Sequence, residues 1–356
     1  MNRKHLSALG LALLLGVAGG AQTAFASGEK VAPLQKPVMF DPDASEAIDG
    51  NALFWVNPTN GAKGVKRVII PFFQIQFVQD AQANATGGGG AHSRTSVELE
   101  GPTNAQMQAI TDEVFAAFIA DLEAAGLEVI RPEAAKSFPA FNDIMAAGKP
   151  SGQMVKGLNS VRSQFYSPTG MNFYFLPTML PELAGGGSMT AAGNAQIVRK
   201  EADLLNQSGA AVVGLRAVVD FATLSASDRR GLSVFASKAK TGAEFGLLIK
   251  PQATQLFLIT PEAKATMTDP QNRMRLELQA PLMIDSRAIL AAEDNKTVGQ
   301  KRSEIAGNAL SLLTGVGMSK SQSFAVKVDP TIWERDVTVA LKSVSRAATT
   351  KLKSGL

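Results

Sequence analysis

The fold of this 356-residue chain is decided by the run Val68-Ile69-Ile70-Pro71-Phe72-Phe73-Gln74-Ile75-Gln76-Phe77-Val78. Its first part is apolar and rich in β-branched and aromatic residues, and its second part alternates strictly between polar and apolar residues. A continuous apolar run is typical of a strand buried on both faces, whereas alternation indicates burial on one face. We therefore predict a long strand over residues 66–78 that is buried first on both faces and then on one.

A glycine-rich loop and a helix follow this strand. Residues 84–92, with four consecutive glycines at 87–90, are predicted to form a flexible loop. Thr103 and Gln106 have the spacing of a capping box, and apolar residues then recur three and four positions apart. Gly126 stands where a residue in the left-handed conformation ends a helix. The pattern predicts a helix between these two signals.

The next part of the chain repeats this order and then interrupts it. Residues 127–130 are predicted to form a short apolar strand, and Pro132 opens a second helix at a first-turn position. Residues 148–195 are rich in Gly, Pro and Ser and are interpreted as a loop insertion. A helix is expected over 195–207, followed directly by a strand over 210–222.

Three strand-like segments and a final helix are predicted at 243–250, 253–260, 273–290 and 339–352. In the third strand Met274, Leu276 and Leu278 alternate with charged and amide residues, so we expect one dry and one wet face. Helices against a mixed sheet are the predicted architecture, an α+β fold of the α/β sandwich type. The predicted domain spans 65–356 and follows an irregular leader at 27–64.

The first 26 residues carry the signals of export. Basic residues at 3–5 precede a short apolar run at 9–17, and Ala24-Phe25-Ala26 is the pattern that signal peptidase recognises. The apolar run is shorter than the roughly 20 residues that a membrane-spanning helix needs. We therefore predict a signal peptide over 1–26, cleaved after Ala26, and a mature protein in the periplasm of a Gram-negative cell. Association with the outer membrane stays open.

The composition limits which kinds of partner and of membrane anchor the chain can have. The chain has no cysteine, which excludes thiol catalysis, thiolate metal sites, disulfides and a cysteine-linked lipid anchor. The predicted cleavage lowers the formal net charge from +4 to about +2, because it removes two basic and no acidic side chains. Phosphate-backbone binding needs a concentrated basic surface. We therefore expect no lipid anchor and no nucleic-acid partner.

The sequence offers few groups for catalysis. His92 is the one histidine outside the predicted signal peptide, and we interpret it as a solvated loop residue beside the glycines. A zinc site needs three or four nitrogen, sulfur or oxygen ligands, which one histidine and no cysteine do not supply. The pairs Asp112–Glu113 and Glu293–Asp294 are adjacent in sequence, so their side chains point in different directions. We predict no catalytic, cofactor-binding or metal-binding residue.

Five aromatic residues gather within the predicted insertion: Phe165, Tyr166, Phe173, Tyr174 and Phe175. They include both tyrosines of the chain. Such a cluster either lines a contact with a partner or fills a satellite core beneath a long loop. The core interpretation is favoured, and the cluster is kept as the candidate partner contact.

The order of these elements resembles a known family. The strand at 66–78, the helix up to Ala125, the strand at 127–130 ending beside Arg131, and Ser208-Gly209-Ala210-Ala211-Val212-Val213-Gly214 are similar to the opening module of the curli-secretion channel family (CsgG-like). They are also similar to the N-terminal domain of TolB. The resemblance rests on the order of elements and not on a catalytic signature, and it implies a soluble module that assembles with itself or with envelope proteins.

In the channel proteins, two hairpins from each subunit join those of its neighbours in an outer-membrane barrel. A lipid-facing hairpin alternates apolar and polar residues over about 10 positions. Residues 224–245 instead hold six charged and two aromatic side chains, which is a poor lipid-facing surface. The main hypothesis is therefore a non-enzymatic periplasmic cell-envelope protein that binds envelope components or itself. The alternatives are an outer-membrane secretion-channel subunit and a carboxylate-dependent envelope hydrolase.

Overall fold

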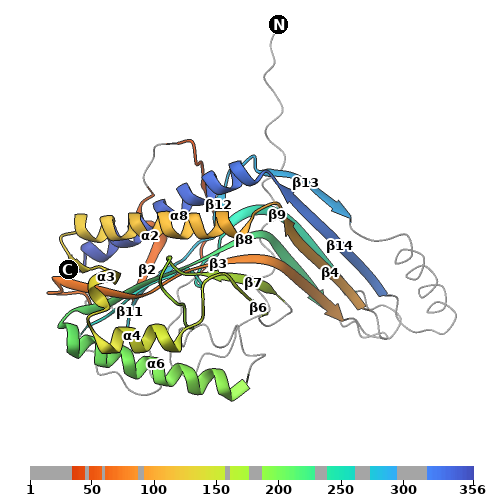
Figure 1. The fold of residues 1–356 in the computed structure, drawn as a ribbon. Coiled ribbons are helices and arrows are strands. Elements are labelled where there is room, and N and C mark those ends of the chain that lie inside the picture. Colours follow the sequence, from red (N-terminus) through yellow and green to blue (C-terminus); the bar gives the residue numbers. More distant parts are fainter. Residues whose placement is uncertain are drawn as a thin grey trace, which may run out of the picture.

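Helices cover both faces of one curled, mixed β-sheet (Figure 1). This computed structural model describes residues 34–44, 48–57, 61–86, 92–156, 161–175, 187–228, 239–260, 273–294 and 319–356. The described residues form a 14-stranded sheet, and its main path runs β1-β12-β9-β8-β3-β4-β14-β13. The predicted α+β architecture is confirmed.

The strands are β1 (Val38–Phe40), β2 (Phe54–Asn57), β3 (Arg67–Thr86), β4 (His92–Glu100), β5 (Glu128–Ile130), β6 (Gln153–Lys156), β7 (Arg162–Tyr166), β8 (Ala211–Asp228), β9 (Ala239–Ile249), β10 (Gln255–Ile259), β11 (Met274–Leu278), β12 (Leu282–Ile284), β13 (Ile289–Asp294) and β14 (Ser319–Val328). The helices are α1 (Gly50–Leu53), α2 (Asn104–Ala124), α3 (Pro132–Ala135), α4 (Pro139–Ala147), α6 (Gly187–Ser208) and α8 (Pro330–Lys353).

Strand β3 is the central strand of the sheet. It is longer than predicted, at 20 residues, and pairs in parallel with β8 along one side. Along its other side it pairs in turn with β5, β7 and β4. The register between β3 and β8 shifts between Ile69 and Phe72. That irregularity contains Pro71, which has no backbone N–H to give to a ladder.

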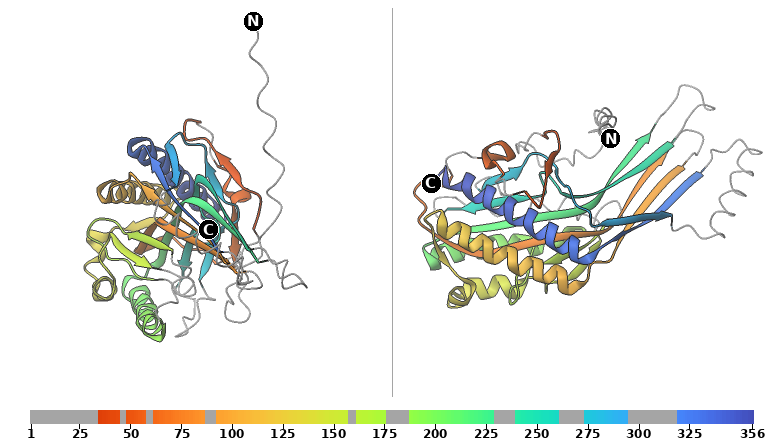
Figure 2. Two further views of the ribbon diagram at one scale, coloured as in Figure 1. Left: turned by 90° about the vertical axis from the view of Figure 1, so that its right-hand side faces the viewer. Right: turned by 90° about the horizontal axis from the view of Figure 1, so that it is seen from above.

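Helices α2 and α8 pack beside each other on one face of the sheet (Figure 2). The predicted capping box is present at Thr103, and Gly126 ends the helix region with a φ of 94°. Rings of the two helices meet the sheet: Phe118 lies 5.7 Å from Phe73, and Trp333 lies 5.7 Å from Phe77. These contacts belong to the larger of two hydrophobic cores.

Opposite charges join α2 to α8. Glu113 of α2 forms an ion pair with Lys342, and the Asp121 carboxylate lies 3.4 Å from the Arg346 guanidinium. Burial raises the pKa of Asp121, while the charge of and hydrogen bond to Arg346 act in the opposite direction. The basic residues of the last helix therefore serve a neighbouring helix as well as the helix dipole.

Helices α3, α4 and α6 cover the other face and enclose the second core (Figure 1). Phe72 of β3 is a central member, with its ring 5.0 Å from Tyr174 and 5.5 Å from Phe257. Because β3 turns Phe72 to this core and Phe73 to the other, it is buried on both faces, as predicted.

Two segments predicted to be irregular join the sheet instead. The predicted leader at 27–64 contains β1, α1 and β2, which pair with or pack beside distant strands. The predicted insertion at 148–195 contains β6, β7 and the first half of α6. The strands β1 and β2 escape sequence analysis because their partners, β12 and β11, lie more than 200 residues away in the chain. Residues 1–33, which include the predicted signal peptide, lie outside the described residues.

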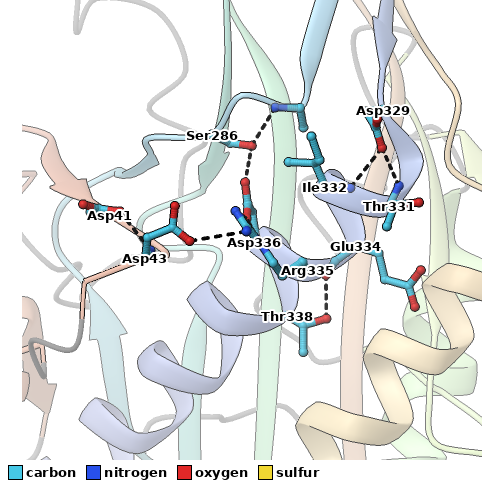
Figure 3. Close-up of polar contacts among 11 residues, drawn as sticks. Asp41, Asp43, Ser286, Asp329, Thr331, Ile332, Glu334, Arg335, Asp336 and Thr338 are labelled. Carbon is cyan, nitrogen blue, oxygen red and sulfur yellow. Dashed lines mark hydrogen bonds and ion pairs between the residues drawn. The ribbon is translucent and has the colours of Figure 1, made fainter.

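The two ends of the sheet meet at a polar corner (Figure 3). Strand β12 lies beside one end and β13 forms the other, and only residues 285–288 join them. Within this link Ser286 donates to the buried Asp336 of α8 at 2.5 Å, and Arg335 Nε donates to the same carboxylate at 2.7 Å. Arg335 also lies 3.3 Å from Asp43, just beyond β1. Helix α8 thus holds the closing turn and the N-terminal strand together.

We expect Gly214→Ala to destabilise the fold by about 1–3 kcal/mol, as for other overpacked cores. An added Cβ would lie 2.5 Å from Cζ of Phe257 and 2.9 Å from the carbonyl oxygen of Phe72. The matched control is Gly246→Ala, whose Cβ would meet the end of Met283 at an ordinary 3.4 Å. Denaturant unfolding of both variants is the measurement, and equal midpoints would contradict the close packing of β8 on β10.

We expect Asp336→Asn to lower the free energy of unfolding by about 1–3 kcal/mol, because it weakens charge-assisted bonds to a buried group. Asp43→Asn removes the other partner of Arg335, but its side chain is 76% exposed. Exposed ion pairs contribute little, so this control should unfold as the parent does. An Asp336→Asn variant that unfolds as the parent does would show that these hydrogen bonds do not stabilise the corner.

Candidate functional site

Three antiparallel strand pairs from distant parts of the chain extend beyond α2 and α8 (Figures 1 and 2). We call this extension the hairpin arm. It consists of residues 80–86 of β3 with β4, residues 220–228 of β8 with 239–249 of β9, and β13 with β14. Its strands follow the order β9-β8-β3-β4-β14-β13.

Small residues line the inner face of the arm. In β4 the side chains of Ser93, Thr95 and Val97 are buried, while those between them point outward. The curl brings β4 and β9 within 8 Å between Cα atoms, although no ladder joins them. Packed sheets usually lie about 10 Å apart, so this approach depends on small side chains. At the base of the arm the rings of Phe245 and Phe324 meet at 5.4 Å.

Charged side chains lie on the described part of the outer face. Arg162 of β7 forms an ion pair with Asp80 and lies 3.9 Å from Glu98. Lys327 of β14 pairs with Glu293 of β13 at 2.9 Å. This pattern is typical of a surface in water, because a lipid-facing strand surface carries an apolar band.

The arm has two edges. Over residues 239–247 of β9 and along β13, no further strand pairs with the sheet within the described ranges. Leu290 of β13 is 65% exposed. A strand edge presents unpaired N–H and C=O groups that can accept a strand from another polypeptide. These two edges are the candidate interaction surface.

The predicted aromatic contact is wrong, because all five side chains are buried. Phe165 and Tyr166 are neighbours on β7, so they enter opposite cores. Phe165 stacks on Phe173 at 5.6 Å, and both rings touch Phe175. Tyr166 instead lies 5.7 Å from Phe77 on the side of α8. The cluster is core, the interpretation that the composition favoured.

A buried polar network surrounds the fifth member, Tyr174. Its hydroxyl donates to Glu201 Oε1 of α6 at 2.7 Å, and Arg273 Nη1 donates to the same oxygen at 3.3 Å. Arg273 Nη2 forms a second, shorter contact with the carboxylate, and the guanidinium carbon lies 5.2 Å from the Phe257 ring centre. Sequence reasoning missed this network, because its members come from three separate segments with no fixed spacing.

Both tyrosines have perturbed acidities. Burial, together with the charge of and hydrogen bond to Glu201, raises the pKa of Tyr174 well above its usual value. Burial raises the pKa of Tyr166 to about 12. Burial lowers the pKa of Arg273, but the charge of and hydrogen bond to Glu201 outweigh it, so the net shift is upward.

The predicted wet face of β11 is buried too. Glu277 lies opposite Gln255 of β10, which lies opposite Arg216 of β8, which lies opposite Gln74 of β3. This polar row crosses four strands on one face, and Arg275 lies 3.5 Å from Glu277 beside it. The predicted alternation along β11 is confirmed. The prediction that its polar face meets solvent is wrong, because the sheet is covered on both faces.

The two carboxylates of the predicted pair Asp112–Glu113 do point in different directions. Asp112 accepts hydrogen bonds from the backbone N–H and the hydroxyl of Thr169, both at 2.7 Å, whereas Glu113 pairs with Lys342. His92 begins β4 and is exposed, so its placement in a loop is corrected. Among the residues with described positions, no group of three or more His, Asp or Glu side chains is arranged to hold a metal ion. No described helix is long and apolar enough to cross a membrane.

The chain matches no protein-family model, no curated protein and no solved structure. The similarity to the curli-secretion family therefore stays a prediction. In the structure an additional strand, β4, lies between β3 and α2, and β5 follows α2.

We expect the folded protein to show no tyrosinate absorption near pH 10, where exposed tyrosines ionise. Because the folded pKa values are raised, their contribution to stability is complete below about pH 10 and is lost as the pH rises further. Alkaline titration in the ultraviolet is the measurement. Tyr174→Phe should flatten the fall in stability above pH 10. Titration of the folded chain at the normal pKa would contradict the buried network.

Proposed function

We propose that this protein is a non-enzymatic cell-envelope protein of the periplasm, whose hairpin arm joins it to further copies of itself. The hairpin arm is the main support for this proposal, because it extends beyond the helices and has two strand edges. Natural proteins cover, shorten or charge such edges when they remain monomeric. Three separate parts of the chain contribute strands to this extension, and we take this as a sign that the extension has a function.

The directions of the strands support head-to-tail contact. Strand β9 is antiparallel to β8, β8 is parallel to β3, and β3 is antiparallel to β4. Strand β14 is parallel to β4 and antiparallel to β13. Consequently β9 and β13 run in opposite directions. When two arms lie side by side in one orientation, β9 of one copy meets β13 of the next as an antiparallel pair, and the contact can repeat around a ring.

The two other hypotheses find less support. A secretion-channel subunit needs an apolar outer band, whereas the outer face of the arm carries Asp80, Glu98, Glu293 and Lys327. An envelope hydrolase needs two carboxylates facing one substrate, about 5–10 Å apart. The described adjacent pair Asp112 and Glu113 instead binds separate parts of the protein.

Native mass spectrometry of the periplasmic fraction tests the proposal, and we expect a defined oligomer. Leu290→Lys should weaken assembly at least tenfold, equivalent to about 1.4 kcal/mol, because it places a charge in the edge contact. Met154→Lys is the matched control, since Met154 is also an exposed apolar residue, at 48%, but lies on β6. The oligomer of this control should equal that of the parent.

Three outcomes would contradict the proposal. They are a protein that stays monomeric at all concentrations, an oligomer indifferent to Leu290→Lys, and a chain retained in the outer membrane after a carbonate wash. The last outcome would favour the channel hypothesis instead.

A further inference from the structure

Exposed apolar side chains concentrate on the N-terminal strand. Five large hydrophobic side chains of the described chain are exposed, and three of them are Leu34, Val38 and Met39, in and beside β1. Met39 is the most exposed of all, at 66%. A single exposed apolar residue needs no explanation, but Val38 and Met39 point to opposite faces of the strand, so both faces of β1 expose an apolar side chain.

Within the described residues, β12 pairs with one edge of β1 and no strand pairs with the other. Val38 donates its N–H to the carbonyl of Pro281 at 2.9 Å, and the carbonyl of Phe40 accepts from Asp285 N–H at 2.8 Å. These bonds turn the backbone groups of Val38 and Phe40 toward β12. Because alternate residues of a strand present their backbone groups to opposite edges, Met39 presents its N–H and C=O to the outer edge. Within the described chain, β1 pairs with no strand but β12.

The groups next to Met39 suit pairing with an identical strand. In an antiparallel pair of two β1 strands centred on Met39, Pro37 lies opposite Asp41. The Pro37 carbonyl can accept from the Asp41 N–H. The two remaining groups need no partner, because Pro37 has no N–H and the Asp41 carbonyl already accepts from Ala44 N–H at 3.2 Å.

We propose that β1 pairs with β1 of a second copy around a two-fold axis at Met39, so that the two sheets become continuous. Each copy supplies the same donors, acceptors and apolar side chains, as a two-fold interface requires. The buried Phe40 and the parallel pairing with β12 hold the strand in place. This contact uses a different edge from the hairpin arm, so it stands or fails separately from the proposed function.

The absence of cysteine gives a direct test, because a single introduced cysteine is the only thiol. Residues that exchange both hydrogen bonds in an antiparallel pair have Cα atoms about 5.5 Å apart, within the range for a disulfide. Met39→Cys should therefore form a covalent dimer under mild oxidation. In Val38→Cys the two thiols belong to diagonal positions about 7–8 Å apart, so cross-linking should be much weaker.

Two further variants complete the experiment. Met154→Cys places a thiol at an exposed methionine away from β1 and measures random cross-linking. Met39→Lys should weaken the dimer at least tenfold in sedimentation, while Leu290→Lys should leave the Met39→Cys cross-link unchanged. Because Met39 is exposed, both of its variants should retain the parent melting temperature.

Equal cross-linking of Met39→Cys and Met154→Cys would overturn the proposal. So would stronger cross-linking of Val38→Cys than of Met39→Cys, which would show a different register. A third result would also overturn the proposal: Met39→Cys does not cross-link to itself, and Met39→Lys no longer binds a different periplasmic protein that the parent binds. The edge of β1 would then belong to that protein.

Discussion

Strand β3 is buried on both faces, and this burial requires the layers that surround it. Phe72 points into one core and Phe73 into the other, and the parallel pairing with β8 satisfies the backbone between them. A strand of this composition in water would expose both apolar faces, so it requires a helical layer above and below. Helices α2 and α8 supply one layer, and α3, α4 and α6 supply the other.

The second helical layer determines that polar residues on the sheet are buried and not solvated. Glu277, Gln255 and Arg216 would be solvated on a one-layer sheet, but here they lie in the interior. Burying charges is costly unless each is paired. Glu201 of α6 meets Arg273 at the start of β11, so the covering helix supplies a countercharge for a charge that the sheet presents. The layers are therefore matched by charge as well as by shape.

Beyond the helices, no layer covers the same sheet in the described chain. Its inner face is therefore packed differently from that of the body. Ser93 and Thr95 are buried on its inner face and Phe245 meets Phe324 at its base, and β4 and β9 curl close to one another. The curl does not occupy the edges. The helical layers thus account for stability in the body, while the arm and β1 leave backbone groups available to other chains.

The elements that could be predicted from the sequence are those whose signals are local. The capping box at Thr103, the glycine terminator at Gly126 and the apolar run of β3 each depend on residues a few positions apart. Tertiary structure alone decided which faces meet water. It buried the polar side of β11, divided Phe165 from Tyr166, and recruited β1 and β2 from an irregular-looking leader. The physical reason is that burial depends on what packs from elsewhere in the chain, and no short stretch of sequence contains that information.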